Sequence, residues 1–170
     1  PLRPRPRNHL GLPPSAVGFR YPRHGKPFLE TSPATIYFNV RHSAERALYA
    51  LSKIAQPGVD IEFAHREIDC EKLARRFFTQ NEFAALQELA PSSRKRAFLT
   101  CWTRKEAVIK ASGDGLSLPL NQFEVTVETG SEPRIIAAHA PQIADCTLYA
   151  ADTGADYVAA VALYNGPAPK

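Results

Sequence analysis

Three carboxylates stand at spacings that would let them share one cation. Asp60 and Glu62 alternate with apolar residues in "GVDIEF", so a half-buried strand would place both acids on one face. Glu106 lies in "WTRKEAVIK", where a helix would place Lys110 one turn further along. Close carboxylates raise each other's pKa unless a cation lies between them. If the helix packs on the strand, the three acids can hold a hard cation such as Mg²⁺, and Lys110 can hold a phosphate oxygen.

Two other interpretations of these residues remain open. Asp60 and Glu62 can be solvent-facing strand residues, with Glu106 and Lys110 as a common type of surface pair one helical turn apart. A metal-dependent nuclease also gathers acids and a lysine, but around a strand. The interval of four between Glu106 and Lys110, filled with helix formers, favours a helix instead.

The acids need a strand and a helix that pack together, and the rest of the chain supplies both. Thr79 and Glu82 have capping-box spacing, and the longest helical pattern has a serine cap at its start and Gly113 as its stop. The expected helices are 70–78, 79–89 and 92–112, and the expected strands are 35–40, 47–53, 57–63, 123–129, 134–140, 146–152 and 157–164.

This order of strands, helices and strands, without βαβ alternation, predicts an α+β fold with a largely antiparallel sheet. The 170 residues fit one domain or two small halves that share a core. No run of about 18 apolar residues appears, so no membrane span is expected. The three cysteines have no short spacing, which predicts neither a disulfide framework nor a zinc site and favours a reducing cytosol.

The beginning of the chain is basic and rich in proline. Residues 1–30 hold six basic residues against Glu30 alone, and residues 1–34 hold eight of the fifteen prolines, so regular structure is not expected there. The segment lacks the apolar core of a secretory signal. Residues 1–8 are expected to form a disordered basic arm, although such a segment can also attract nucleic acid, phosphates or an acidic protein.

Five short motifs occur in an order that resembles one enzyme family. They are "GKPFL" (25–29), "FNVRHS" (38–43), "GVDIE" (58–62), "RRFFTQNE" (75–82) and "WTRKEAVIKASGDGLSLPL" (102–120). Together they resemble the 4'-phosphopantetheinyl transferases of the broad-specificity type that activates peptide synthetases and other carrier proteins. The resemblance covers about residues 10–128.

The resemblance implies a fold of two similar halves with antiparallel sheets and a long helix. Residues 1–62 would form a shortened N-terminal half and residues 63–170 the C-terminal half, with one active site between them. It also implies transfer of phosphopantetheine from coenzyme A to a serine of an acyl or peptidyl carrier protein, with release of 3',5'-ADP. The shortened half leaves open a homologue that only binds coenzyme A or a carrier protein.

The family's functional residues match positions of this chain. Asp60, Glu62 and Glu106 would hold Mg²⁺, or Mn²⁺, against the diphosphate. Glu106 would also accept the proton of the serine hydroxyl, directly or through water, and Lys110 would contact the coenzyme A diphosphate.

Other matches concern coenzyme A itself. Lys26 and Pro27 match a Gly-Lys-Pro that borders the adenine, although alone this motif would be a surface turn. His42 matches a histidine that binds a phosphate of coenzyme A, although a histidine after a strand is otherwise a structural capping group. Arg41 departs from the family, which usually has serine there, and would add a phosphate contact or crowd the adenosine site.

Three more residues of these motifs are Glu82, Trp102 and Lys105. Glu82 matches a family acid near the metal, but it can equally be only the capping-box acid. Trp102 is expected in the core, joining the helix to the sheet, and the role of Lys105 stays open. Members of the family with two halves act as monomers, so a monomer is expected, although a shortened half can expose apolar surface that drives pairing. The expected place is the cytoplasm, with no nucleic-acid or membrane partner.

Overall fold

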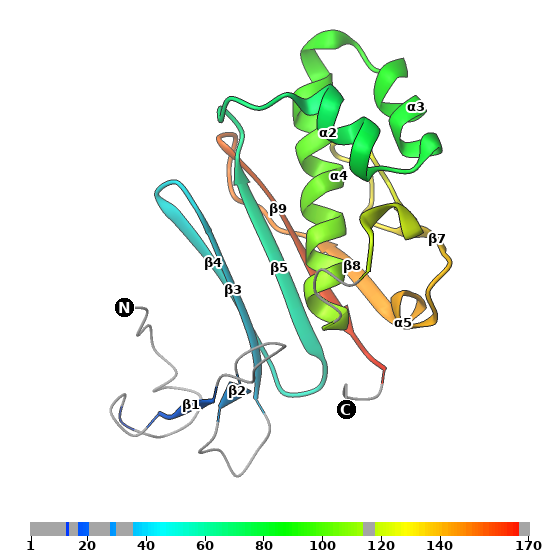
Figure 1. Cartoon of the computed structure of the whole chain (residues 1–170). Helices are drawn as coiled ribbons and strands as arrows, with labels where there is room; N and C mark the ends of the chain where they lie inside the picture. The colour runs from blue at the N-terminus through cyan, green and yellow to red at the C-terminus, as the bar shows by residue number, and fades with distance from the viewer. Residues whose placement is uncertain (1–12, 14–16, 21–27, 30–35, 114–117, 167–170) are drawn as a thin grey trace.

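A long helix lying against a three-stranded sheet forms the centre of the molecule (Figure 1). The computed structural model describes residues 13, 17–20, 28–29, 36–113 and 118–166. The helix is α4 (Pro91–Ser112), and the antiparallel sheet has the strand order β5 (Gln56–Phe63), β9 (Tyr157–Tyr164) and β8 (Cys146–Ala150).

The remaining elements surround this centre. The other pairs of strands are β1 (Phe19–Arg20) with β2 (Phe28–Leu29), β3 (Tyr37–Ser43) with β4 (Arg46–Ser52), and β6 (Phe123–Val125) with β7 (Ile135–Ala138). The shorter helices are α2 (Cys70–Phe77), α3 (Gln80–Glu88), the 3₁₀ turn η3 (Leu120–Gln122) and α5 (Pro141–Ala144). The structure therefore confirms an α+β fold with antiparallel sheets.

The helix α4 approaches β5 at Gly58, where no side chain separates them. A Cβ atom added at Gly58 would lie 2.0 Å from the carbonyl oxygen of Ala107 and 2.3 Å from the nitrogen of Ala111. Only glycine permits this approach. The contact sets the position of residues 106–110 of α4 relative to the acids of β5.

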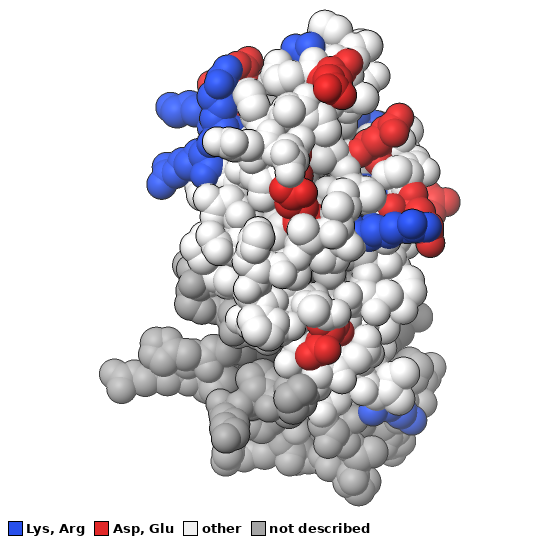
Figure 2. Space-filling model, turned by 90° about the vertical axis from the view of Figure 1, so that its right-hand side faces the viewer, with Lys and Arg blue, Asp and Glu red and all other residues white. Residues whose placement is uncertain are grey.

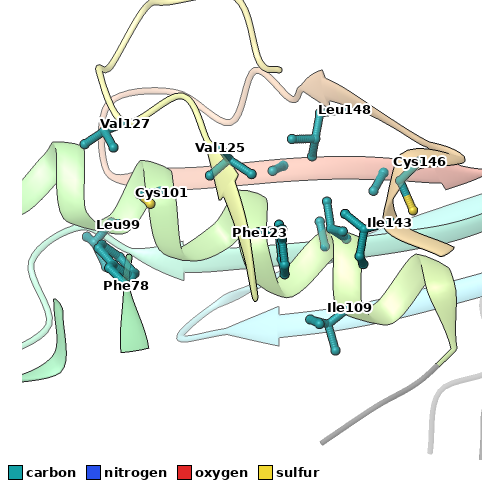
Figure 3. Close-up of a cluster of buried hydrophobic side chains, with 14 of the residues drawn as sticks. Phe78, Leu99, Cys101, Ile109, Phe123, Val125, Val127, Ile143, Cys146 and Leu148 are labelled. Carbon is teal, nitrogen blue, oxygen red and sulfur yellow. The ribbon is translucent and has the colours of Figure 1, made fainter. Parts of the chain in front are cut away.

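Apolar side chains from α4, the sheet, β6 and α5 form one core (Figure 3). Phe123 and Ile143 have no exposed surface, and Leu148 of β8 is 6% exposed. Such burial removes apolar area from water and stabilises the fold by roughly 25 cal/mol per Å². The core therefore makes α4 and the sheet a firm platform for the polar residues between them.

The hairpin of β3 and β4 joins β5 through side chains, because β3 and β5 belong to separate sheets. The backbone N–H of Val59 donates to Oδ1 of Asn39 at 2.9 Å, and that of Phe63 donates to Oγ of Ser43 at 3.0 Å. These two side chains satisfy donors on the outer edge of β5 that would otherwise lack partners. The hairpin thereby covers the outer edge of β5, the strand that carries Asp60 and Glu62.

Most of the expected elements are confirmed, but three expectations were wrong. The strand β5 is buried on both faces, since Val59 and Asp60 are both 0% exposed. The helix α4 has no serine cap: Ala90 precedes it without a side-chain hydrogen bond, and Pro91 takes its first turn. Regular structure does occur within residues 1–34, as the short strands β1 and β2. Gly113 ends α4 in a left-handed conformation with φ 83°, as expected.

Residues 1–8, expected as a disordered arm, lie outside the described residues. No helix in the described part of the chain is long and apolar enough to cross a membrane. The expected division between residues 62 and 63 falls inside β5, which pairs along its whole length with β9. The division into two halves stays a prediction.

Candidate active site

The two acids of β5 form the buried part of a polar cluster between this strand, α4 and the hairpin. The side chains of Asp60 and Glu62 are 1% and 3% exposed. They alternate with Val59 and Ile61, so they share the strand face on which Gly58 meets α4. Buried carboxylates require partners, and all of the partners found here are cationic or polar side chains.

Lys110 links the acids of the strand to the helix. Its Nζ donates to Oδ1 of Asp60 at 2.5 Å and to the carbonyl oxygen of Val59 at 3.3 Å. The same Nζ lies 3.8 Å from Oε2 of Glu106, one turn earlier on α4. The side chains of Lys110 and Glu106 are 24% and 29% exposed, so this side of the cluster is open to water.

Two arginines cover the acids from the other sides. The Nε of Arg41 lies 3.2 Å from Oδ1 of Asp60, and its Nη2 lies 3.4 Å from Oε1 of Glu62. Arg66, four residues beyond Glu62 in the loop after β5, pairs with Oε2 of that acid. The sequence left two roles open for Arg41, towards a phosphate or against adenosine, and in the structure it pairs with both acids of β5.

The carboxylate of Asp60 is only partly satisfied. Its Oδ2 is the one buried side-chain nitrogen or oxygen in the described ranges that has no hydrogen-bond partner. Burial, with a smaller effect of the neighbouring Glu62, raises the pKa of Asp60 to about 6 against the lowering effects of Lys110 and Arg41. The site therefore favours an additional positive charge at this carboxylate.

These residues fit a hard cation, although they do not form a complete coordination shell. Within the described part of the chain, no three His, Cys, Asp or Glu side chains form a group that could hold a metal ion. The atoms gathered around Lys110 are nevertheless all oxygens, from two carboxylates and the carbonyl of Val59, which is the kind of ligand that Mg²⁺ prefers, and Oδ2 of Asp60 lacks a partner. A metal bound by Asp60, Glu62 and Glu106 stays a prediction.

The predicted coenzyme A residues are separated from this cluster or lie outside the description. Lys26 and Pro27 are not among the described residues. His42 is exposed on β3, directly after Arg41, and pairs in register with Ala47. Because successive side chains of a strand point to opposite faces, His42 lies on the face away from Asp60.

Two pockets elsewhere contain none of the site residues. A groove of about 720 Å³ lies between β7 and β8, and a pocket of about 140 Å³ adjoins Arg96 and Arg104. The face at the right of Figure 1 carries scattered charges separated by neutral side chains (Figure 2). The chemistry expected from the sequence is therefore concentrated between β5, α4 and the hairpin.

Comparison with known families agrees with this arrangement. Residues 56–162 match the sequence model of the 4'-phosphopantetheinyl transferase superfamily, a segment that contains β5, α4 and most of β9. The chain belongs to this superfamily. The resemblance found in the motifs is thus confirmed.

Two transferases of the superfamily illustrate the similarity. The 4'-phosphopantetheinyl transferase HetI of Nostoc sp. is 37% identical over 127 residues, which are 74% of this chain and 53% of HetI. The transferase gsp of Aneurinibacillus migulanus is 40% identical over 114 residues, 67% of this chain and 46% of that protein. The chain thus spans about half the length of these relatives.

The fold agrees with a solved transferase. The holo-[acyl-carrier-protein] synthase of Thermotoga maritima superimposes with a TM-score of 0.50 over 65% of this chain and 62% of that protein. The identity is 18%, so this likeness shows the transferase fold and nothing further.

The sequence left the lysine of the transferase motif "KEA" without a role, and the structure supplies one. Lys105 is fully buried, 2.8 Å from Oε1 of Glu82, and it donates to the carbonyl oxygens of Leu120 and Phe123 at 2.8 and 2.5 Å. Glu82 also completes the predicted capping box with Thr79. Lys105 and Glu82 therefore form a structural ion pair that ties α4 to α3, to η3 and to the start of β6.

Trp102 of the same motif is partly buried against the core, as expected, and its aromatic neighbours lie on α2 and on α4 itself. Its ring packs edge-on against Phe77 at 5.7 Å and stacks with Phe98 at 5.8 Å between ring centres. It therefore joins α4 to α2. Sequence alone did not reveal which neighbour an aromatic side chain on this helix would meet.

Proposed function

We propose that this chain transfers 4'-phosphopantetheine from coenzyme A to a serine of an apo acyl or peptidyl carrier protein, with Mg²⁺ or Mn²⁺, releasing 3',5'-ADP. The observation that carries the proposal is the contact of Lys110 with Asp60 and Glu106, beside a buried carboxylate oxygen that lacks a partner. It occurs in a chain of the 4'-phosphopantetheinyl transferase superfamily.

In this proposal Asp60, Glu62 and Glu106 hold the metal, which neutralises the diphosphate when it is bound. Glu106 accepts the proton of the serine hydroxyl, since its side chain is 29% exposed and open to an incoming group. The serine oxygen forms a bond to the phosphorus that carries pantetheine. The phosphoanhydride bond breaks, and its electron pair leaves with 3',5'-ADP.

Lys110 offsets the negative charge that grows on the leaving phosphate. Its Nζ is held by Asp60 and Val59, so the charge is already positioned before the substrate arrives. The proposal also includes contacts to coenzyme A. Its adenine is bordered by Lys26 and Pro27, and one of its phosphates is bound by His42.

The relatives' names support the activity, but they belong to proteins about twice as long as the matching region. We propose that residues 1–62 belong to an N-terminal half and residues 63–170 to the C-terminal half, with the site between them. The proposed place of the protein is the cytoplasm, as the cysteine spacing in the sequence favours. We further propose that the protein acts as a monomer and binds neither nucleic acid nor a membrane.

A nuclease is disfavoured because Glu106 lies on α4, whereas the nuclease arrangement needs this acid on a strand. The remaining alternative is a homologue that binds coenzyme A or a carrier protein without turnover. The chain spans about half the length of the relative HetI, so the test below also covers this alternative.

Intact-mass spectrometry of apo carrier proteins tests the proposal. An acyl and a peptidyl carrier protein are each incubated with coenzyme A, Mg²⁺ and this chain, and the Glu106→Gln variant serves as a matched control. A mass gain of one phosphopantetheine on either carrier, absent with the control, supports the transferase. If no mass is gained but calorimetry shows coenzyme A binding, the result supports the binding-only homologue. If there is neither a mass gain nor coenzyme A binding, both the transferase and the binding-only homologue are overturned.

A further inference from the structure

Arg41 makes a contact that the proposed reaction does not use. Its guanidinium spans the two acids of β5, with Nε 3.2 Å from Oδ1 of Asp60 and Nη2 3.4 Å from Oε1 of Glu62. Among the described residues it is the only cationic side chain that pairs with both acids. Lys110 pairs with Asp60, and Arg66 pairs with Glu62.

We infer that Arg41 is an internal counter-ion that competes with the divalent cation for Asp60 and Glu62. The inference rests on the proposed function, since it assumes that these two acids hold the metal. The same carboxylates cannot give their full charge to a metal while a guanidinium pairs with both of them. Arg41 therefore lowers the metal affinity of the chain, and metal binding releases its guanidinium.

The position of Arg41 suits a counter-ion that can be displaced. Its side chain is 43% exposed, whereas the acids are 1% and 3% exposed, so the arginine can turn into water while the acids stay buried. The contacts of 3.2 and 3.4 Å are longer than those of a tight charge-assisted pair. Asp60 keeps its unpartnered Oδ2 in the presence of Arg41, so the arginine leaves the carboxylate incompletely satisfied.

Arg41 is also separable from the attachment of the hairpin. Asn39 and Ser43, on the same face of β3, accept the N–H groups of Val59 and Phe63 without any help from Arg41. Replacing Arg41 therefore leaves these two hydrogen bonds in place.

Direct measurement of Mn²⁺ binding tests the inference without substrate. Free Mn²⁺ is followed by electron paramagnetic resonance in titrations of the full chain, Arg41→Ser and Arg41→Lys. Arg134→Ser is the matched control, because it removes the same charge from an exposed pair with Glu132, 68% and 70% exposed, that does not involve the site. Circular dichroism confirms that each protein is folded.

We expect Arg41→Ser to bind Mn²⁺ about tenfold more tightly than the parent, on the order of what two partly exposed ion pairs contribute. The Mn²⁺ affinity of Arg41→Lys should lie between those of the parent and of Arg41→Ser, since one ammonium group pairs with the two acids less well than a planar guanidinium. Arg134→Ser should match the parent.

Equal or weaker binding by Arg41→Ser, or the same gain in Arg134→Ser, overturns the inference. Absence of Mn²⁺ binding in every protein overturns it together with the metal site. The mass test on carrier proteins is run on the same preparations, so failure of the competition is distinguished from failure of the transferase. Transfer by the parent with unchanged Mn²⁺ affinity in Arg41→Ser rejects the role of Arg41 alone.

Discussion

The Nζ of Lys110 lies 2.5 Å from Oδ1 of Asp60, across the contact between α4 and β5. Spacing along the helix predicted a pair with Glu106, but that distance is 3.8 Å. The lysine is therefore held mainly by an acid 50 positions away in sequence, which joins the strand and the helix at the proposed reaction centre.

Lys110→Ala should slow turnover roughly a hundredfold or more while weakening coenzyme A binding much less. Negative charge grows on the leaving phosphate during the reaction, so the lysine contributes more in the transition state than in the ground state. Turnover is measured by carrier-protein mass and binding by calorimetry. Lys110→Arg should recover only part of the rate, and near-normal rates in both variants would remove Lys110 from the site.

Asp60→Ala and Glu106→Ala should each abolish transfer while the fold survives. Each change removes an oxygen ligand and leaves the diphosphate charge less shielded, and loss of Asp60 also relieves its repulsion with Glu62. Transfer is followed by mass spectrometry and folding by thermal melts in EDTA. A melt far below that of the parent would assign these acids to a structural ion pair instead.

Asp60 should make the metal-free protein less stable as the pH rises. Its pKa is raised from 3.8 to about 6 in the folded state, so the folded chain binds a proton more tightly than the unfolded chain. The stability that the folded state gains from this tighter proton binding is fully present below pH 3.8 and is lost as the pH rises through about 6. The free energy of unfolding should change by at most about 3 kcal/mol across this range.

Urea unfolding of the parent and of Asp60→Asn, in EDTA at several pH values from about 4 to 7, isolates this effect from the other titrating groups. The stability of the parent relative to Asp60→Asn should fall as the pH rises. A difference that rises with pH instead would mean that Lys110 and Arg41 stabilise the charged acid more than burial disfavours it.

Gly58→Ala should lower the free energy of unfolding by about 3 kcal/mol or more. The new methyl group would lie 2.0 Å from backbone of α4, which cannot turn aside as a side chain can. Gly130→Ala is the matched control, because nothing lies within 4 Å and only its positive φ of 86° opposes the change. The control should cost about 1 kcal/mol, and equal losses in urea unfolding would contradict the close contact.

The sequence allowed prediction of the elements that carry the site, because periodicity is a local property. Alternation identified β5, and the capping box of Thr79 and Glu82 is present as expected. The start of α4 was misjudged, since Pro91 begins the helix without a serine cap. Local rules allow either start, and the packing around the helix end decides between them.

The partners of the acids could not be predicted from spacing. Arg41 meets Asp60 only because the hairpin folds over the edge of β5, and that contact joins separate sheets. Lys105 was equally undetermined, because its acid lies on α3 and its two carbonyl acceptors lie after α4.

The two edges of β5 are protected from water in different ways. One edge is hydrogen-bonded to the backbone of β9 along its whole length, whereas Val59 and Phe63 donate to single side chains of β3. Amide hydrogens on one strand should therefore exchange with solvent in two classes, slow towards β9 and faster at Val59 and Phe63. Exchange at these two amides reports the departure of the hairpin, which is the motion that opens the acids to water while the sheet stays intact.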